Sequence, residues 1–296
     1  MNKSLNYCPA RGRCILVVVA AFLLVAGTVR AEPAMWVIKD KDSTIYLIGS
    51  LHLLRHDTEW NAAKVKKTVG ESTELWLEIA DGDDPANLLP IMQQYGFDRE
   101  HPLSGKLNAA QKEKLSKLAA TYNLPLPVLE PMKPWAAALI FAVLPLQKAG
   151  FDPNAGVDRI LKAQAEKEGD KIFGFETAEE QVRMLAELPE TDQVAFLEET
   201  LDDAEKGVAL LDKLATAWLA GDTETIGHIL VDELKTKSPA LYDKLVVQRN
   251  VRWAGKIAEI VKSPGVRQIA VGAAHLAGPD SLQAQLAKRG IKVEPY

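Results

Sequence analysis

Cysteine is nearly absent from this chain of 296 residues. The only two, Cys8 and Cys14, both lie before residue 15. The rest of the chain can form no disulfide, thiolate nucleophile or zinc–thiolate site, because each needs a cysteine sulfur. Cys14 also does not suit a lipid anchor, because it precedes an apolar run instead of following it. Any metal bound by the later residues must therefore have histidine and carboxylate ligands.

The sequence also lacks clusters of positive charge and the common catalytic motifs. Lys and Arg number 35, against 40 Asp and Glu. Nucleic-acid backbones are bound by dense basic patches, so we expect no nucleic-acid partner. No G-x-S-x-G, Walker loop, H-E-x-x-H or G-x-G-x-x-G occurs, and the usual sequence signals of α/β-hydrolases, P-loop NTPases, zincins and dinucleotide-binding domains are missing.

The N-terminus has the pattern of a secretory signal. Arg11 and Arg13 precede an uncharged apolar stretch, residues 15–27, which small residues follow. This stretch suits a signal-peptide core and is short for a membrane span of roughly 20 residues. We expect residues 1–31 to be a signal peptide, cleaved before Glu32. An uncleaved N-terminal anchor is the alternative.

Residues 32–296 form the expected mature domain. They contain 31 basic and 40 acidic residues, a net charge of −9, because residues 1–31 hold four basic residues and no acid. Apolar residues make up 47% of the chain, which is enough for a core. We expect a periplasmic or secreted protein, membrane-anchored if the signal stays in place. The long apolar run at 135–146 is too short to span a bilayer.

Strand patterns lie toward both ends of the chain, and helical patterns fill most of the middle. Strands are expected at 35–39, 44–49, 74–79, 171–175, 267–271 and 292–294. Helices are expected at 59–69, 108–122, 135–146, 157–168, from 177, at 279–289, and in a broken stretch over 190–261. We predict an α/β fold with one central mixed sheet built from N- and C-terminal strands, flanked by helices, with a largely helical insertion.

Two segments repeat one pattern: an apolar strand, a glycine, two residues and a histidine. The first ends in Gly49-Ser-Leu-His52 and the second in Gly272-Ala-Ala-His275. Ligand crevices open at the carboxyl ends of strands in α/β sheets. Glycine lets the backbone turn sharply there or approach a ligand closely. We therefore predict that His52 and His275 converge on one site, with Gly49 and Gly272 beside the ligand or cofactor.

Carboxylates and one arginine–asparagine pair are further candidates. Glu78 interrupts an apolar strand, so it is paired, metal-bound or at a solvated strand end. Glu176 ends another strand, where the dipole of the following helix also favours an acid. Arg249, followed by Asn250, could form a bidentate pair with a carboxylate or lie on the surface. Asp158 suits the first turn of a helix.

The other histidines are weaker candidates. His56 lies four residues after His52, a spacing that pairs metal ligands on a helix. A glycine turn precedes His52, however, so helical geometry is not expected there. His101 and His228 lie in polar surroundings and are expected at the surface.

Taken together and in this order, the motifs resemble those of the TraB/GumN family over essentially the whole of residues 32–296. The matching segments are Gly49-Ser50-Leu51-His52, Leu77-Glu78, Gly156-Val157-Asp158, Phe175-Glu176-Thr177 with Gln181, Arg249-Asn250, and Val271-Gly272-Ala273-Ala274-His275-Leu276 with Gly278. The resemblance implies kinship with Tiki-type metalloproteases that use Mn or Co, plasmid pheromone-shutdown proteins, metal-free erythromycin esterases and haem-binding ChaN-like proteins.

We expect an exported, metal-dependent hydrolase that acts on a peptide or ester bond. His52, Glu78 and His275 would bind Mn, Co, Fe or Zn, and the cation would lower the pKa of a bound water. Alternatively, His52 would activate water directly.

The remaining candidates would assist this chemistry. Glu176 would be a ligand or general base, and Arg249 would stabilise charge on the carbonyl oxygen. Asn250, which follows Arg249, is counted among the catalytic candidates. The alternative function is a non-enzymatic protein that binds haem, a metal or a peptide signal.

Overall fold

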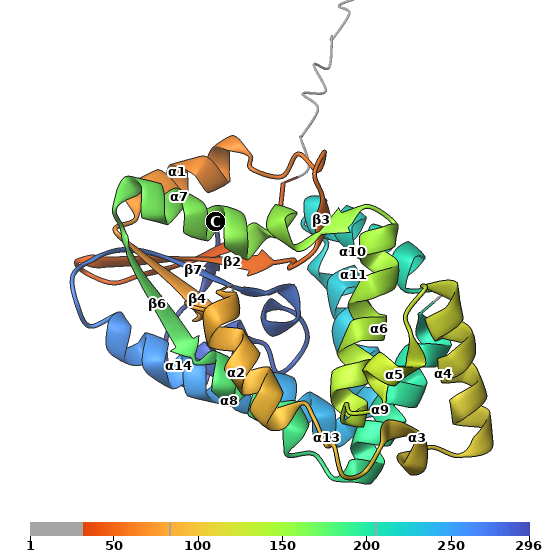
Figure 1. The fold of residues 1–296 in the computed structure, drawn as a ribbon. Coiled ribbons are helices and arrows are strands. Elements are labelled where there is room, and N and C mark those ends of the chain that lie inside the picture. Colours follow the sequence, from red (N-terminus) through yellow and green to blue (C-terminus); the bar gives the residue numbers. More distant parts are fainter. Residues whose placement is uncertain (1–31, 83, 205) are drawn as a thin grey trace, which may run out of the picture. The chain divides into compact units, whose positions relative to one another are not determined.

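The computed structural model describes residues 32–82, 84–204 and 206–296, so the expected signal peptide lies outside the described residues. Within them, a six-stranded sheet has the order β6-β4-β7-β2-β1-β8, and a separate small sheet pairs β3 with β5 (Figure 1). The strands are β1 (Met35–Lys39), β2 (Ser43–Ser50), β3 (Leu54–Arg55), β4 (Glu74–Ile79), β5 (Phe151–Asp152), β6 (Lys171–Glu176), β7 (Gly265–Gly272) and β8 (Glu294–Pro295).

The sheet is mixed. β1 and β2 form an antiparallel hairpin, and β8 pairs antiparallel with β1. The other neighbours, β2 with β7, β7 with β4 and β4 with β6, are parallel. The carboxyl ends of four strands therefore meet at one edge of the sheet, at Ser50, Gly272, Ile79 and Glu176.

Helices connect the strands and fill the middle of the chain. They are α1 (Ala63–Glu71), α2 (Pro85–Tyr95), α3 (Leu103–Lys106), α4 (Ala109–Thr121), α5 (Leu126–Leu129), α6 (Pro134–Lys148), α7 (Val157–Glu168), α8 (Ala178–Ala186), α9 (Glu190–Asp203), α10 (Gly207–Leu219), α11 (Thr223–Gly227), α12 (Glu233–Lys237), α13 (Pro239–Tyr242), α14 (Gln248–Ile260) and α15 (Leu282–Ala287). Short helical turns are η1 (Pro153–Ala155) and η4 (Ala273–Leu276), and two π-helical segments are η2 (His228–Asp232) and η3 (Asp243–Val247).

Helices cover both faces of the sheet (Figure 1). On one face, Val65 of α1 and Leu161 of α7 belong to a core that includes Ile48. On the other face, Ile257 of α14 and Leu282 of α15 pack in a second core. Burying each such aliphatic side chain contributes about 1.5–3 kcal/mol before the cost of ordering it.

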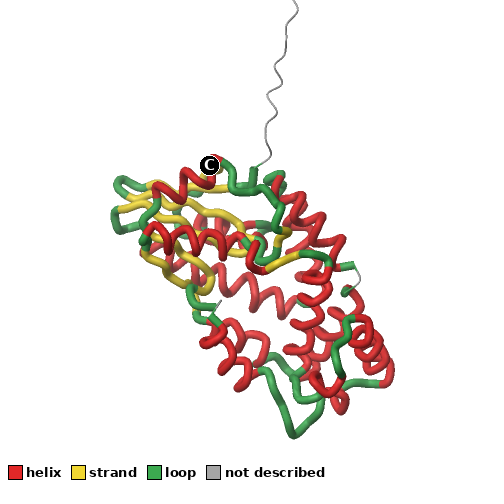
Figure 2. The backbone as a smooth tube through the Cα atoms, turned by 45° about the horizontal axis from the view of Figure 1, so that its top comes forward, coloured by secondary structure: helices red, strands yellow, loops and turns green. Residues whose placement is uncertain are grey.

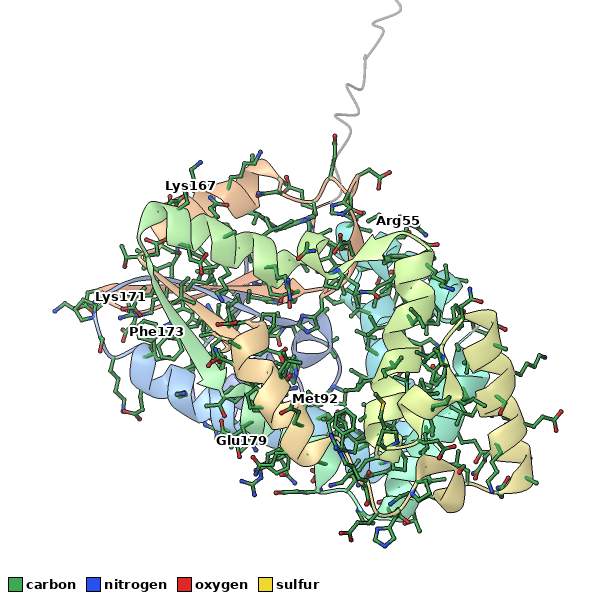
Figure 3. All side chains as sticks on the ribbon, in the orientation of Figure 1. Arg55, Met92, Lys167, Lys171, Phe173 and Glu179 are labelled. Carbon is green, nitrogen blue, oxygen red and sulfur yellow. The ribbon has the colours of Figure 1, made fainter. Side chains whose placement is uncertain are left out.

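The helical insertion has a core of its own. Phe141 of α6, Leu118 of α4 and Leu197 of α9 pack together in a third cluster. Figure 2 shows this helical part extending away from the strands. Arg55 of β3, labelled in Figure 3, forms an ion pair with Asp212 of α10 at 3.1 Å, which ties the small sheet to the helices.

The predicted fold class is confirmed, including the mixed sheet and the helical middle region. Helices α4 and α8 both begin with a capping box, in which Asn108 and Thr177 each accept from the backbone amide of the third residue of the helix. The bounds of the last helix and of the last strand were predicted wrongly. The last helix begins at Leu282, because Ser281 and not residue 279 caps it, and the last strand is Glu294–Pro295.

One helix boundary in the N-terminal part also differs from the prediction. The helix expected at 59–69 begins only at Ala63, after an extended Ala62. Across residues 32–82, 84–204 and 206–296, no helix combines the length and the apolar character that crossing a membrane requires.

Candidate active site

The carboxyl ends of the four parallel strands bring together residues that are far apart in the sequence. His52 lies two residues beyond β2, and Glu78 lies near the end of β4. Glu176 is the last residue of β6, and His275 lies in η4 directly after β7. Arg249 reaches the same place from the first turn of α14.

A buried ion-pair cluster forms the floor of this site. Arg249 donates from Nε to Glu176 at 3.2 Å, and its Nη2 donates to both Glu176 and Glu78. Its Nη1 donates to the Leu245 carbonyl at 3.1 Å and to His275 Nε2 at 3.0 Å. A guanidinium has five N–H groups, so these contacts use all of them. Arg249 therefore has no N–H left for a substrate oxygen in this arrangement.

Two further donors complete the pairing of Glu78. The Gly272 amide donates to its Oε1 at 2.6 Å, and Gln181 donates to its Oε2 at 3.2 Å and to Glu176 Oε1 at 3.1 Å. Burial raises the pKa of Glu78, but the charges of Arg249 and His52, together with the Gly272 amide, hold it well below its usual range. Glu78 is thus an ionised carboxylate inside the protein.

His275 is a neutral side chain with a fixed tautomer. Because Arg249 can only donate, His275 Nε2 must accept, and its proton lies on Nδ1. That Nδ1 contacts Asn250 Oδ1 at 2.7 Å, and Asn250 in turn donates to the Asp280 carbonyl at 2.8 Å. Desolvation, opposed by Glu78 and reinforced by Arg249, lowers the pKa of His275 to about 3. Trp253 covers the ring, with the ring centroids 4.4 Å apart.

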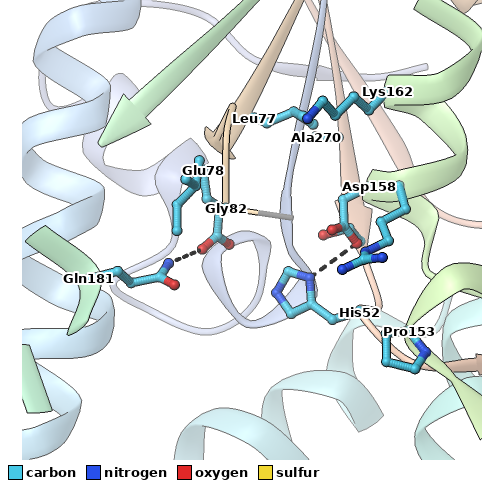
Figure 4. Close-up of a pocket in the computed structure, with 12 residues that line it drawn as sticks. His52, Leu77, Glu78, Gly82, Pro153, Asp158, Lys162, Gln181 and Ala270 are labelled. Carbon is cyan, nitrogen blue, oxygen red and sulfur yellow. Dashed lines mark hydrogen bonds and ion pairs between the residues drawn. The ribbon is translucent and has the colours of Figure 1, made fainter. Parts of the chain in front are cut away.

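His52 has the opposite environment. Its Nδ1 lies 3.1 Å from Asp158 Oδ1, and 57% of its side chain is exposed. Desolvation lowers the pKa of His52, but the hydrogen bond and charge of Asp158 and the charge of Glu78 outweigh this and raise it to about 9. Figure 4 shows the His52–Asp158 pair beside Glu78 and Gln181.

Local backbone contacts hold this pair in place. The Val157 amide, at the start of α7, donates to the Leu51 carbonyl at 3.0 Å. Gly156 lies so close to the His52 loop that a Cβ there would be 2.5 Å from the His52 carbonyl oxygen. The glycine therefore allows the first turn of α7, which carries Asp158, to approach His52.

The two histidines and Glu78 converge on one small volume. A Cβ placed on Gly272 would lie 3.0 Å from Glu78 Oε1, 3.6 Å from His275 Cδ2 and 3.8 Å from His52 Nε2. Two cavities meet there: one of about 260 Å³ that includes Asp158, and one of about 470 Å³ that includes His275. His52, Glu78 and Gln181 line both.

The donor set has the right chemistry for a divalent cation, but its present arrangement does not fit one. His275 Nε2 already accepts from Arg249, and its Nδ1 is bound to Asn250. Both oxygens of Glu78 accept hydrogen bonds, one of them from the positively charged Arg249. Among the side chains that the structure describes, no three His, Cys, Asp or Glu residues are placed to hold a metal ion.

Some of the predicted site residues lie behind the cavities. Asn250 is fully buried and contacts His275 from the far side. Gly49 packs against Ala273, where a Cβ would lie 3.1 Å from its Cα, and the Gly49 carbonyl accepts from Trp218 at 2.8 Å. Gly272, in contrast, lines the larger cavity.

The remaining histidines lie outside the site. His56 pairs with Asp152 at 2.7 Å and is 70% exposed. His101 and His228 are exposed, each beside an aspartate of its own segment, as the sequence predicted.

Two residues of the site were missed as functional candidates. Asp158 was assigned to a helix start, and both Asp158 and Gln181 were otherwise named only as parts of a family pattern. A signal for each exists in the sequence: Asp158 follows a glycine at a helix start, and Gln181 lies one turn into a helix that begins at the end of β6.

The sequence that builds this site matches a known protein family. The model of the TraB/PrgY/gumN family matches residues 34–295, and the chain belongs to that family. The resemblance predicted from the motifs is thereby confirmed.

Two relatives extend over most of the chain. It is 26% identical over 256 residues to the uncharacterized protein YbaP of Escherichia coli (strain K12), which covers 86% of this chain and 92% of that protein. The uncharacterized protein YbaP of Shigella flexneri is 27% identical over 243 residues, covering 81% and 87%. No solved structure matches the chain.

Proposed function

We propose that this protein is an exported hydrolase of ester or peptide bonds in which His52 is the general base. The observation that carries the proposal is the environment of His52. Its Nδ1 is held by Asp158, and its Nε2 lies where two cavities meet, close to the buried Glu78 carboxylate. A histidine oriented by a carboxylate and facing a cavity is the arrangement that general-base catalysis needs.

The chemistry follows from the orientation of the ring. When His52 is neutral, its Nδ1–H donates a hydrogen bond to Asp158, so the lone pair is on Nε2. Nε2 removes a proton from a water molecule, whose oxygen attacks the substrate carbonyl carbon. The Glu78 Oε1 atom can accept the second water hydrogen and so orient the water. His52 then returns its proton to the leaving oxygen or nitrogen as the bond to the carbonyl carbon breaks.

Metal dependence is the second candidate. The observation that favours it is that three ligand-type side chains, His52, Glu78 and His275, lie within 4 Å of one point above Gly272. For a cation to bind there, Arg249 would have to release His275 Nε2 or Glu78. The reaction outlined above needs no such rearrangement, and for that reason we place it first.

The experiment is a hydrolysis assay of the purified protein on a panel of p-nitrophenyl esters and peptides. His52→Gln is expected to lower kcat/KM by roughly 10²- to 10⁴-fold, the usual contribution of a positioned acid or base. His56→Gln is the matched control, because His56 also pairs with an aspartate but lies outside both cavities. Hydrolysis that survives His52→Gln unchanged would rule the proposal out.

The same preparation decides between the two candidates and the non-enzymatic alternative. Activity that persists after dialysis against a chelator supports water activation by His52 alone. Activity that is lost and then restored by Mn, Co, Fe or Zn supports the metal site. Haem uptake followed by absorbance, without turnover of any substrate, would support a binding protein instead.

A further inference from the structure

The larger of the two cavities at His52 has an apolar wall. It has a volume of about 470 Å³, and its lining includes Trp135, Leu139, Val182, Leu185, Leu211 and Leu230. These side chains come from α6, α8, α10 and η2, so the helical insertion and the helices after it build the wall. A cavity of this size and lining can bury most of a small apolar group.

The smaller cavity differs in character. Its volume is about 260 Å³, and Asp158 and Arg159 contribute charged side chains to its wall. His52 and Ser50 line both cavities. An occupant that fills both is therefore amphiphilic, with its apolar and polar parts joined beside His52.

One unpaired buried polar atom marks where such an occupant would bind. Ser50 is 2% exposed, and within the described residues its hydroxyl has no hydrogen-bond partner. Ser50 lines both cavities. An unpaired buried donor costs about 1–3 kcal/mol, so the Ser50 hydroxyl is a candidate to bind an oxygen of a ligand.

We propose that the substrate is an ester or amide of an aliphatic acid. The acyl chain occupies the larger cavity, the carbonyl oxygen accepts a hydrogen bond from the Ser50 hydroxyl, and the polar leaving group occupies the smaller cavity. Bond cleavage by this route rests on the proposed function, whereas binding of the acyl chain does not require it. A peptide chain fits the larger cavity poorly, because its backbone N–H and C=O groups would face leucine side chains without partners.

The first test measures binding without turnover. Octanoate, which cannot be hydrolysed, is titrated by calorimetry into the wild-type protein and into the Leu211→Trp variant. The indole would fill part of the larger cavity, and at least a tenfold loss of affinity is expected. Leu210→Trp is the matched control, because Leu210 is the neighbouring residue on α10, is 41% exposed and does not line the cavity. No octanoate binding, or equal losses in both variants, would overturn the acyl site.

The second test measures turnover in the otherwise unchanged protein. The p-nitrophenyl ester of octanoate should be hydrolysed with at least about tenfold higher kcat/KM than the acetate ester, because the longer chain buries more apolar surface. Leu211→Trp should abolish this preference, and Leu210→Trp should keep it. Ser50→Ala should lower kcat and keep the preference for the octanoate ester. Equal hydrolysis of both esters overturns the substrate class.

The failure of this inference and that of the proposed function are distinguishable. Octanoate binding without hydrolysis of any ester would overturn the role of His52 as a base and leave the acyl site standing. If hydrolysis depends on His52 but the protein neither binds octanoate nor prefers the longer ester, the acyl site is overturned and the role of His52 as a base stands.

Discussion

The two histidines of the paired G-x-x-H elements occupy opposite environments. His52 is 57% exposed and pairs with Asp158, which raises its pKa to about 9. His275 has a side chain only 5% exposed and faces Arg249, and its pKa is lowered to about 3. The two pKa values differ because of the neighbouring charges as much as because of burial. A carboxylate stabilises the charged imidazolium, whereas a guanidinium and a protein interior without water destabilise it.

This difference assigns different tasks to two similar segments. His52 is mostly protonated at neutral pH and loses its proton as the pH rises toward 9, and its Nε2 faces the cavities. His275 stays neutral and uses both ring nitrogens to hold Arg249 and Asn250. We therefore regard His52 as the residue that transfers the proton and His275 as a positioning residue that holds the buried ion-pair cluster. Three substitutions test that division.

The largest effect on stability is expected from a substitution in the buried ion-pair cluster. Arg249→Met would leave Glu78 and Glu176 buried without their cation, at a cost of about 3–5 kcal/mol in the free energy of unfolding. Urea unfolding measures it. Arg252→Met is the control on the same helix: Arg252 is 54% exposed and lies 3.7 Å from Glu176, so a loss within about 1 kcal/mol is expected.

The pH dependence of that loss follows from the depressed pKa of Glu78. The stabilisation is present above the unfolded pKa of about 4.3 and disappears as the pH falls toward the lower folded value. The stability difference between the wild type and Arg249→Met should therefore narrow in acid. Equal stabilities of Arg249→Met and Arg252→Met at neutral pH would contradict a structural role for the cluster.

An intermediate effect is expected where the chain approaches His52 most closely. Gly156→Ala would place a methyl group 2.5 Å from the His52 carbonyl oxygen, so the loop or α7 must move. A loss of about 1–3 kcal/mol is expected, together with lower activity, because His52 and Asp158 would separate. Gly70→Ala, with nothing within 4 Å of the new methyl, serves as the control in thermal unfolding and in the hydrolysis assay. Full activity of Gly156→Ala would show that this contact does not position His52.

The smallest effect on stability, and the most specific effect on pH dependence, is expected from Asp158→Asn. A base with a pKa of about 9 is mostly protonated at neutral pH, so wild-type activity should rise with pH up to about 9. Without the Asp158 charge, the pKa of His52 should fall toward 6.5 or lower, and the rising limb should shift to lower pH by about two units. The plateau should fall at least about tenfold, because the ring loses its orienting partner. A pH–rate profile unchanged by the substitution would exclude His52 as the titrating base.

Much of the fold was predictable because its signals are local. Helix α7 was predicted at its observed bounds, since an apolar face follows Gly156 and Gly169 ends the helix in a left-handed conformation. Strand β4 was also predicted correctly from its apolar run. The last helix was misplaced because a proline near a helix start suggested an earlier first turn than the Ser281 side chain supports.

The candidate site was only partly predictable. The sequence singled out Glu78, Glu176 and Arg249 but did not decide between a buried site and a solvated or surface position for them. The order of residues alone does not reveal which carboxylate pairs with which cation. Asp158 was assigned to a helix start, since its partner His52 is 106 residues away.

Local residue patterns were enough to specify where strands end, where glycines let the backbone turn, and that two histidines follow strands in the same way. The tertiary structure decided what those histidines can do. It inserted Arg249 between two buried carboxylates and against His275, and it placed Asp158 against His52. The physical reason is that a pKa depends on the charges and solvent within a few ångströms, and here those charges come from residues 26 to 171 positions apart in the chain.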